Sequence, residues 1–370
     1  MILNLISLIN YKNHEHLKVN FSDDINCFLG KNGVGKTNLL DAIYYLSFCK
    51  SYYSNVELNN IRYGESFFMI QGDYTDDNNN KCVVSSSLQN KQKKVQLNNK
   101  KYNKLSNHIG KIPLVIITPM DSSVILGGSD ERRRFFDKFL SQLDRNYMND
   151  LILYNKVLQQ RNILLKKYSS IKDSRELLSV YDNSLCEYGD KIYLKRTECI
   201  QNIIEIVQKY YNIISNQSEF VDIRYQSQLY EADFLQLLQN SRKKDQILTY
   251  TTNGIHRDDF IFSINKHSLR KSGSQGQQKT FLIALKFAYF EILKDLLKMK
   301  PILLLDDIFD KLDHDRVEQI IRILNEKEFG QIFITDTSKE RIDKILNKVN
   351  IQSKYFIFDK NGTFYEECKN

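Results

Sequence analysis

The segment from Gly30 to Thr37 contains the residues whose types and spacing point most directly to chemistry. It satisfies G-x-x-x-x-G-K-[ST] at every fixed position, which is the pattern of a phosphate-binding loop. Glycines let successive backbone N–H groups face the β- and γ-phosphates, and a following helix adds its positive end. Lys36 is expected to reach the terminal phosphates, and Thr37 to bind Mg²⁺. The predicted nucleotide-binding residues are Gly30, Lys31, Asn32, Gly33, Val34, Gly35, Lys36 and Thr37.

Two adjacent carboxylates follow an apolar run much later in the chain. Ile302–Leu305 is predicted to be a buried strand that ends in Asp306 and Asp307. Asp306 is placed to hold Mg²⁺, directly or through water, and Asp307 to orient or deprotonate an attacking water. Alone, this pattern is equally typical of an acidic turn, but the phosphate loop favours a catalytic pair. Thr335 ends the next strand and is a candidate sensor of the γ-phosphate, with a polar strand end as the alternative.

A second glycine-containing loop precedes a helix at residues 272–279. One nucleotide rarely needs two such sites from one chain, so we interpret this loop as a signature that caps the γ-phosphate held by a second subunit. A flexible loop before a helix is the alternative. Asp313 is predicted to lie where the two subunits meet, although aspartate is also favoured as a plain helix cap. The signature residues acting in trans are Ser274, Gln275, Gly276 and Gln277.

The elements that must position these residues alternate between strand and helix. Ile25–Leu29 is a short apolar run that leads into the loop, and helical spacing begins at Thr37. From about residue 130, apolar residues step by three and four from Phe136 to Leu158, which predicts one continuous helix, and a second stripe follows to about Ile214. We therefore predict a discontinuous α/β ATPase lobe at 1–120 and 250–370, with a helical second lobe inserted at 121–249.

Composition narrows the class of protein. The chain has 370 residues, of which 42% are hydrophobic and 26% charged, and its formal net charge is +8. The hydrophobic and charged fractions are typical of a globular protein. The modest positive net charge permits a polyanionic partner but does not establish one. Apolar runs are too short to span a bilayer, and the six cysteines form no C-x-x-C pair. Reduced thiols and a cytoplasmic location without a membrane partner are the expectation.

Lysines dominate one stretch. Between Asp77 and Asp121 the chain contains no acidic residue, whereas lysines recur from Lys81 to Lys111. Such a stretch can contact DNA phosphates, but a solvated hairpin whose charged edge resists aggregation is an equal alternative. The candidate DNA contacts are Lys91, Lys93, Lys94, Lys100 and Lys101.

The motifs together resemble the RecF family of bacterial replication and repair ATPases, whose head is related to SMC proteins and ABC ATPases. The resemblance covers essentially the whole chain and rests on GKNGVGKTNLLDAIYYLS, GGSDERRRFFDKFLSQLD, GIHRDDF, SGSQGQQKTFLIALKFAYFEIL, PILLLDDIFDKLD and QIFITDT. It implies an ABC-type head fold, ATP with Mg²⁺, and an ATP-dependent homodimer. It also implies binding to single-stranded and gapped duplex DNA, the partners RecO and RecR, and recombinase loading. Hydrolysis in the family is typically slow and works as a switch.

Some positions depart from the family pattern. Lys12 stands where an arginine is usual, Ile255 replaces a proline, and Asp310 stands where a serine is common. Tyr52 and Tyr53 lie where the family has arginine. Lysine keeps the charge of arginine but loses its planar fork, which weakens the expectation of a nucleotide contact at position 12.

Three other functions compete. An ABC transporter subunit would have Leu-Ser-Gly-Gly-Gln as its signature, glutamate at position 307 and a switch histidine after Thr335, none of which this chain has. An SMC-like clamp needs a coiled coil of hundreds of residues, and the predicted insertion is far shorter. A scaffold that binds ATP with negligible turnover would use the same ATP-binding residues as a weak ATPase, so the sequence does not distinguish the two.

Overall fold

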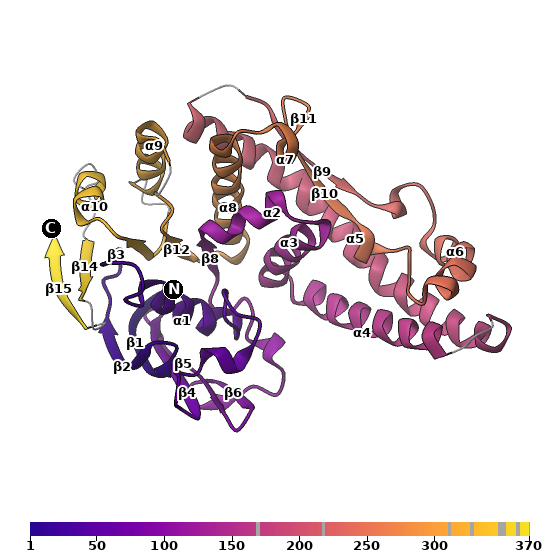
Figure 1. The fold of residues 1–370 in the computed structure, drawn as a ribbon, viewed down its shortest axis with the longest axis horizontal. Coiled ribbons are helices and arrows are strands. Elements are labelled where there is room, and N and C mark those ends of the chain that lie inside the picture. Colours follow the sequence, from indigo (N-terminus) through magenta and orange to yellow (C-terminus); the bar gives the residue numbers. More distant parts are fainter. Residues whose placement is uncertain are drawn as a thin grey trace. The chain divides into compact units, whose positions relative to one another are not determined.

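The structure is a computed structural model that describes residues 1–167, 171–216, 219–309, 312–325, 329–346, 353–359 and 363–369. The chain forms two compact units (Figure 1). Unit 1 consists of Met1–Asp121, Tyr210–Gln217 and Ile283–Asn370, and unit 2 consists of Ser122–Lys209 and Ser218–Leu282. Each unit is therefore assembled from segments that are distant in the sequence.

The boundary after the helical insertion differs from the sequence-based one. Residues 250–282 were predicted to belong to the ATPase lobe, but they lie in unit 2. Strand β10 (Asp259–Ile264) pairs antiparallel with β9 (Val221–Gln226), and the ring of Phe260 stacks on Phe136 with centroids 4.0 Å apart. Alternating apolar residues predict a strand, but they do not say which sheet the strand joins.

A six-stranded sheet in unit 1 has the order β15-β14-β3-β13-β12-β8. The strands from β14 to β8 run parallel, and β15 pairs antiparallel with β14. Because β13 lies between β3 and β12, the carboxyl ends of these three strands meet at one edge, where ligands bind in open α/β sheets. The strands are β3 (Ile25–Leu29), β8 (Leu114–Ile117), β12 (Ile302–Asp306), β13 (Ile332–Asp336), β14 (Ser353–Phe358) and β15 (Phe364–Lys369).

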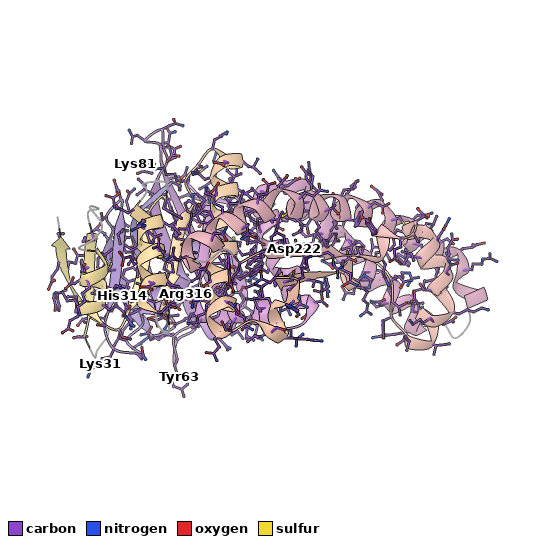
Figure 2. The ribbon with its side chains drawn as sticks, turned by 90° about the horizontal axis from the view of Figure 1, so that it is seen from above. Lys31, Tyr63, Lys81, Asp222, His314 and Arg316 are labelled. Atoms are coloured by element: carbon purple, nitrogen blue, oxygen red, sulfur yellow. The ribbon has the colours of Figure 1, made fainter. Side chains whose placement is uncertain are left out.

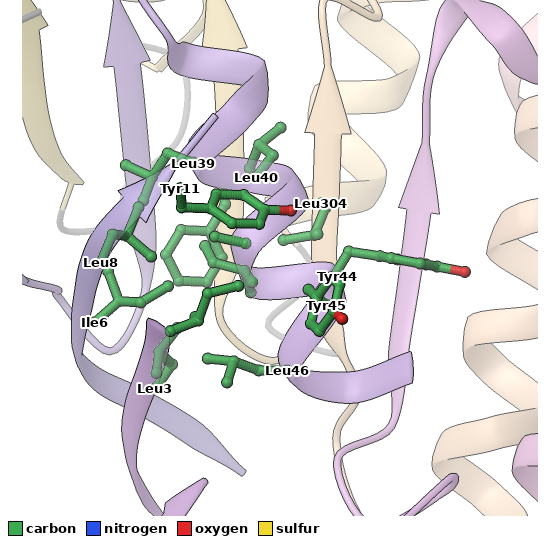
Figure 3. Close-up of a cluster of buried hydrophobic side chains, with 14 of the residues drawn as sticks. Leu3, Ile6, Leu8, Tyr11, Leu39, Leu40, Tyr44, Tyr45, Leu46 and Leu304 are labelled. Carbon is green, nitrogen blue, oxygen red and sulfur yellow. The ribbon is translucent and has the colours of Figure 1, made fainter. Parts of the chain in front are cut away.

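The helix that follows the phosphate loop is almost entirely buried. Helix α1 (Lys36–Phe48) shares one hydrophobic core with residues of the parallel sheet, such as Leu304 of β12, and with residues of strand β1, such as Leu8 (Figure 3). Its nearly continuous apolar sequence is typical of a helix covered on several sides. Strand β1 belongs to a second, antiparallel sheet in the order β2-β1-β4-β5-β6-β7. These strands are β1 (Ile2–Tyr11), β2 (His14–Asn20), β4 (Phe67–Thr75), β5 (Lys81–Gln89), β6 (Gln92–Leu97) and β7 (Lys100–Lys101).

Shorter helices complete unit 1. Helices α9 (His314–Asn325) and α10 (Lys339–Leu346) follow strands β12 and β13, which gives the strand–helix alternation of a parallel sheet. Single 3₁₀ turns occur at Glu57–Asn60, Leu105–Asn107 and Pro119–Asp121.

Unit 2 is mainly helical with a small antiparallel sheet, β11-β10-β9. The predicted continuous helix from Phe136 to Leu158 is interrupted at Asp144, whose backbone is extended. The Asp144 carboxylate accepts hydrogen bonds from the amides of Asn146 and Tyr147, so it ends one helix and caps the next. The remaining elements are α2 (Ser122–Leu126), α3 (Ser129–Leu143), α4 (Arg145–Lys167), α5 (Ile171–Ser215), the 3₁₀ turn Gln228–Tyr230, α6 (Phe234–Leu248), the 3₁₀ turn Ile255–Arg257, β11 (His267–Ser268), α7 (Leu269–Ser272) and α8 (Gln275–Leu297). Helices α5 and α8 each contribute residues to both units.

Candidate functional site

The phosphate loop connects β3 to α1 in a conformation that requires glycine. Gly30, Gly33 and Gly35 have φ values of 147°, 87° and 108°, which L side chains rarely adopt. A side chain at Gly35 would also collide with Asn13 and His14, and one at Gly30 with the carbonyl of Phe358. The positive φ values and these close contacts explain why glycine is required at these positions of the loop.

The turn between β1 and β2 packs against the loop. His14 Nε2 donates to the carbonyl of Gly35 at 3.1 Å, and Asn13 Nδ2 donates to the carbonyl of Val34 at 3.3 Å. Asn38, on α1, donates to Asn13 Oδ1 at 2.7 Å. Burial lowers the pKa of His14, so its ring stays neutral at neutral pH. These contacts hold the phosphate loop in place. The loop pattern alone does not indicate Asn13 or His14, because they belong to a different element.

Lys36, near the end of the phosphate loop, is buried. Its Nζ donates to the carbonyls of Gly30 at 2.7 Å and Lys31 at 3.0 Å. Burial lowers the pKa of the ammonium, and the nearby carboxylates of Asp307 and Asp306 oppose that shift. By contrast, Lys31 at the tip of the loop is exposed and extends away from the ribbon (Figure 2). The two lysines of the loop therefore differ: Lys36 is buried, and Lys31 faces solvent.

Asp306 lies at the centre of a set of hydroxyl groups. Thr37 Oγ1 donates to Asp306 Oδ1 at 2.9 Å, and Thr335 Oγ1 donates to the same oxygen at 2.7 Å. The structure therefore brings together three predicted residues from α1, β12 and β13. Thr335 is fully buried, so its hydroxyl holds Asp306 in place, and the sensing role assigned to it stays a prediction.

Asp307 has an unusual backbone. Its φ of 47° lies in the left-handed region, where aspartate is more tolerated than most residues. The amide of Asp307 donates to Thr335 Oγ1 at 3.0 Å, which holds the residue in this conformation. Burial raises the pKa of the Asp307 carboxyl, and the neighbouring charge of Asp306 adds to the effect. Strained residues of this kind cluster at functional sites.

One further carboxylate lies at this edge of the sheet. Asp336 ends β13 and is buried, and Arg341 of α10 donates to both of its oxygens at 2.8 and 3.0 Å. Because Arg341 neutralises Asp336, the acid pair at Asp306 and Asp307 remains the one without an arginine partner among the described contacts.

These residues fit a nucleoside triphosphate with Mg²⁺. Within the described residues, no side chain caps the N-terminus of α1, so its first amides are available to an anion. A Cβ built on Gly33 would meet no atom within 4 Å, which leaves open space beside the loop. Thr37 and Asp306 offer the hydroxyl and carboxylate oxygens that Mg²⁺ prefers.

The predicted signature lies in unit 2 and forms a reciprocal cap. The Ser274 amide donates to Gln277 Oε1 at 2.8 Å, and the Gln277 amide donates to Ser274 Oγ at 3.2 Å. This is the capping-box geometry of a helix start. Gln277 also donates to Glu219 at 2.7 Å, whereas Ser274 and Gln275 are exposed. Gly276 lies in the first turn of α8.

Asp313 caps helix α9. Its Oδ1 accepts from the Arg316 amide at 2.9 Å, and its Oδ2 pairs with the Arg316 guanidinium at 3.0 Å. The Asp313 and His314 side chains are exposed, and Arg316 is half-buried (Figure 2). The local role is therefore that of an N-cap, and the role at a subunit interface stays a prediction. Asp310 lies outside the described residues.

The lysine-rich stretch forms β5, β6, β7 and their turns, and Lys81 extends from the surface (Figure 2). Four candidate DNA contacts are exposed on this hairpin, but Lys93 is not. Lys93 Nζ donates to Glu57 Oε1 and to the carbonyl of Cys49, and it lies 4.8 Å from the centroid of the Tyr45 ring. Side chains alternate along β6, so Lys93 points to the face that packs on the protein. Lys93 is thus a structural contact. The exposed four are Lys91, Lys94, Lys100 and Lys101.

The arginine-rich and His-Arg-Asp motifs meet within unit 2. Arg132 forms two hydrogen bonds with Asp259, at 2.7 and 2.9 Å. Arg133 donates to the carbonyl of Asp258 at 2.6 Å, and the Asp258 carboxylate accepts from Tyr225. Charge-assisted pairs of this kind fix the relative position of two segments. The two motifs therefore tie α3 to β10.

His256 belongs to the same structural cluster. Its Nδ1 lies 2.8 Å from the hydroxyl of Tyr154, and its Nε2 lies 3.1 Å from the carbonyl of Thr251. Burial lowers the pKa of His256 to about 4, so the ring is neutral at physiological pH. Arg257 donates to the same carbonyl at 3.0 Å. These partners give the motif a structural role within unit 2.

Among the described residues, no helix combines the length and apolar character that crossing a membrane requires.

Comparisons with known proteins agree with this architecture. A family model of the RecF/RecN/SMC N-terminal domain matches residues 2–356. The DNA replication and repair protein RecF of Phocaeicola vulgatus is 46% identical over 358 residues, which cover 96% of each chain. The protein of the same name from Bacteroides thetaiotaomicron is 45% identical over 361 residues, or 97% of each chain.

Solved structures show the same fold. The recombination mediator protein RecF with ATP, from the RecFOR pathway, aligns with a TM-score of 0.89 and 30% identity, covering 99% of this chain and 97% of that one. The SMC head domain of Pyrococcus furiosus aligns with a TM-score of 0.58 and 14% identity, covering 100% and 96%. The predicted ABC-type ATPase head fold is confirmed.

Proposed function

The chain belongs to the RecF family of DNA replication and repair proteins, and we propose that it works as an ATP-controlled dimer on DNA. In this proposal, ATP joins two subunits, the dimer binds single-stranded and gapped duplex DNA, and the complex promotes loading of a recombinase together with RecO and RecR. The observation that carries the proposal is that one chain has two glycine-containing loops that each lead into a helix, the phosphate loop before α1 and the loop with exposed Ser274 and Gln275 before α8.

The residues of unit 1 supply the nucleotide site. The amides of Gly33 to Lys36 and the Lys36 ammonium would bind the β- and γ-phosphates, because they are the donors of the phosphate loop and of the start of α1. Thr37 and Asp306 would hold Mg²⁺, which neutralises phosphate charge when it is bound. Asp307 would orient a water and accept its proton, since a carboxyl with a raised pKa is a better base.

Slow turnover would make hydrolysis a release signal. The second subunit would contribute Ser274 to Gln277, of which Ser274 and Gln275 are exposed, to complete the γ-phosphate environment, with Asp313 nearby. Loss of the γ-phosphate would then remove the bridge between the subunits. Family membership outweighs the transporter and clamp alternatives, and the longest described helix, α5, has only 45 residues.

A substitution at the signature tests the dimer. With Ser274→Arg, we expect the ATP-dependent dimer to be lost while ATP still binds the monomer, because the bulky cation would occupy the position facing the partner's phosphate. Light scattering coupled to gel filtration, with and without ATP and Mg²⁺, measures the mass. Asn183→Arg, on the exposed surface of α5, is the matched control and should dimerise normally. Dimers of Ser274→Arg as stable as those of the wild type would contradict the trans arrangement.

The exposed hairpin lysines are proposed to contact DNA phosphates. Replacing Lys91, Lys94, Lys100 and Lys101 by alanine should reduce the steepness with which affinity for gapped DNA falls with salt, by up to about four released counterions. Fluorescence anisotropy titrations at several salt concentrations give this slope. The control changes the same charge elsewhere, by alanine at the exposed Lys156, Lys166, Lys243 and Lys244. Equal slopes for both variants would leave the hairpin as a solvated edge.

A further inference from the structure

The loop that follows α1 is fastened to a buried carboxylate. Asp41 lies on α1 and is fully buried. It accepts hydrogen bonds from the Ser51 hydroxyl and the Tyr52 amide at 2.7 Å each and from the Tyr11 hydroxyl at 2.6 Å. Lys12 neutralises it at 2.5 Å. A buried charge needs such partners, and this set ties the loop to α1.

The same loop fixes the backbone and ring of Tyr53. Ser51 Oγ accepts from the amides of Tyr53 at 3.2 Å and Ser54 at 3.0 Å, which closes a tight turn. The Lys12 ammonium lies 5.5 Å from the centroid of the Tyr53 ring, and the Tyr52 ring packs edge-on against it with centroids 5.4 Å apart. Tyr53 therefore has little freedom to move.

The hydroxyl of Tyr53 donates to Asp306 Oδ2 at 2.6 Å. The other oxygen, Oδ1, already accepts from Thr37 and Thr335. A carboxylate has about four lone-pair sites, so these three hydroxyls fix its rotation and leave one site on Oδ2. Burial raises the pKa of Tyr53, and Asp306 adds to the effect, which keeps the hydroxyl protonated as a donor.

We propose that Tyr53 is a positioning residue for the metal site: its hydroxyl sets the orientation in which Asp306 receives Mg²⁺ with bound nucleotide. This inference rests on the proposed nucleotide site. It assigns a role to a position at which the chain lacks the arginine usual in the family it resembles. Partners that orient a metal ligand contribute strongly to metal affinity.

Tyr53→Phe keeps the ring contacts and removes only the hydroxyl. We expect the Mg²⁺ concentration that gives half-maximal binding of a fluorescent ATP analogue to rise about tenfold, while affinity for the analogue in EDTA stays the same. Tyr52→Phe is the matched control, because the Tyr52 hydroxyl donates to Asp121. An unchanged or lower Mg²⁺ requirement for Tyr53→Phe would overturn the inference.

A double-mutant test separates positioning from a general loss of structure. In an Asp306→Asn background, the added Tyr53→Phe change should no longer shift the Mg²⁺ requirement, because the group that it orients has lost its charge. An equal shift in both backgrounds would overturn the inference. If the wild-type protein itself binds the analogue without any response to Mg²⁺, the proposed nucleotide site fails. If it responds to Mg²⁺ and Tyr53→Phe behaves identically, only the role of Tyr53 fails.

Discussion

Replacing Lys36 by alanine should weaken ATP binding about a thousandfold, since truncating one partner of a buried charged contact costs several kcal/mol. The Lys36 ammonium is the buried cation of the loop, held 2.7 Å from the Gly30 carbonyl, and its removal leaves the terminal phosphates without that charge. Titration calorimetry with ATP and Mg²⁺ measures the change.

Lys31→Ala is the matched control for this experiment. Lys31 belongs to the same loop and carries the same charge, but its side chain is exposed, so screening by water should keep the loss of affinity within a few fold. Wild-type affinity in Lys36→Ala would show that the loop does not bind the triphosphate in the expected way. Circular dichroism should show both variants folded.

Asp307→Asn should reduce ATP hydrolysis by about a hundredfold or more while leaving ATP affinity nearly unchanged, because a positioned general base contributes at least that much. Asparagine has the same shape and tolerates the left-handed backbone that Asp307 adopts, so the change isolates the carboxylate. Single-turnover release of phosphate from bound ATP measures the rate.

The same variant distinguishes a switch from a passive scaffold. If hydrolysis ends the DNA-bound state, Asp307→Asn should stay on DNA far longer than the wild type after excess competitor DNA is added. Asp336→Asn is not a suitable control, because Asp336 forms an ion pair with Arg341 that this change would remove. Wild-type hydrolysis in Asp307→Asn would assign the base elsewhere, and equal dissociation rates would favour the scaffold.

Local patterns predicted the strands and the helix that carry the candidate site residues. The phosphate loop lies between a strand and a helix, and Asp306 lies at the end of a buried strand. Parallel strands bring their carboxyl ends together, so adjacency in space followed from the fold class. Tyr53 is different: its partner Asp306 is 253 residues away, and a tyrosine after a helix carries no signal of that contact.

Two features were harder to predict: the direction in which a strand's side chains point, and the sheet that a strand joins. Lys93 and Lys94 are neighbours in sequence, yet one points inward to Glu57 and the other to solvent, because the side chains of a strand alternate. A run rich in lysine hides this alternation, since both residues look like surface residues. The strand at Asp259–Ile264 lies within the segment predicted to belong to the ATPase lobe, but its pairing with β9 puts it in unit 2.

The signature at residues 274–277 is compatible with two roles, a local helix cap and a contact with the phosphate of a partner subunit. Ser274 and Gln277 form a capping box that any helix start can use, and this local purpose is fully satisfied within one chain. Their proposed second purpose, on the phosphate of a partner, depends on the exposure of Ser274 and Gln275, which the sequence does not determine.

The central claim, that ATP controls DNA binding, is tested most directly by fluorescence anisotropy on a gapped duplex with ATP, with ADP and without nucleotide. The account predicts tight binding with ATP alone, and loss of that binding in Lys36→Ala but not in Lys31→Ala. Binding that is equally tight in all three conditions, or unaffected by Lys36→Ala, would contradict it.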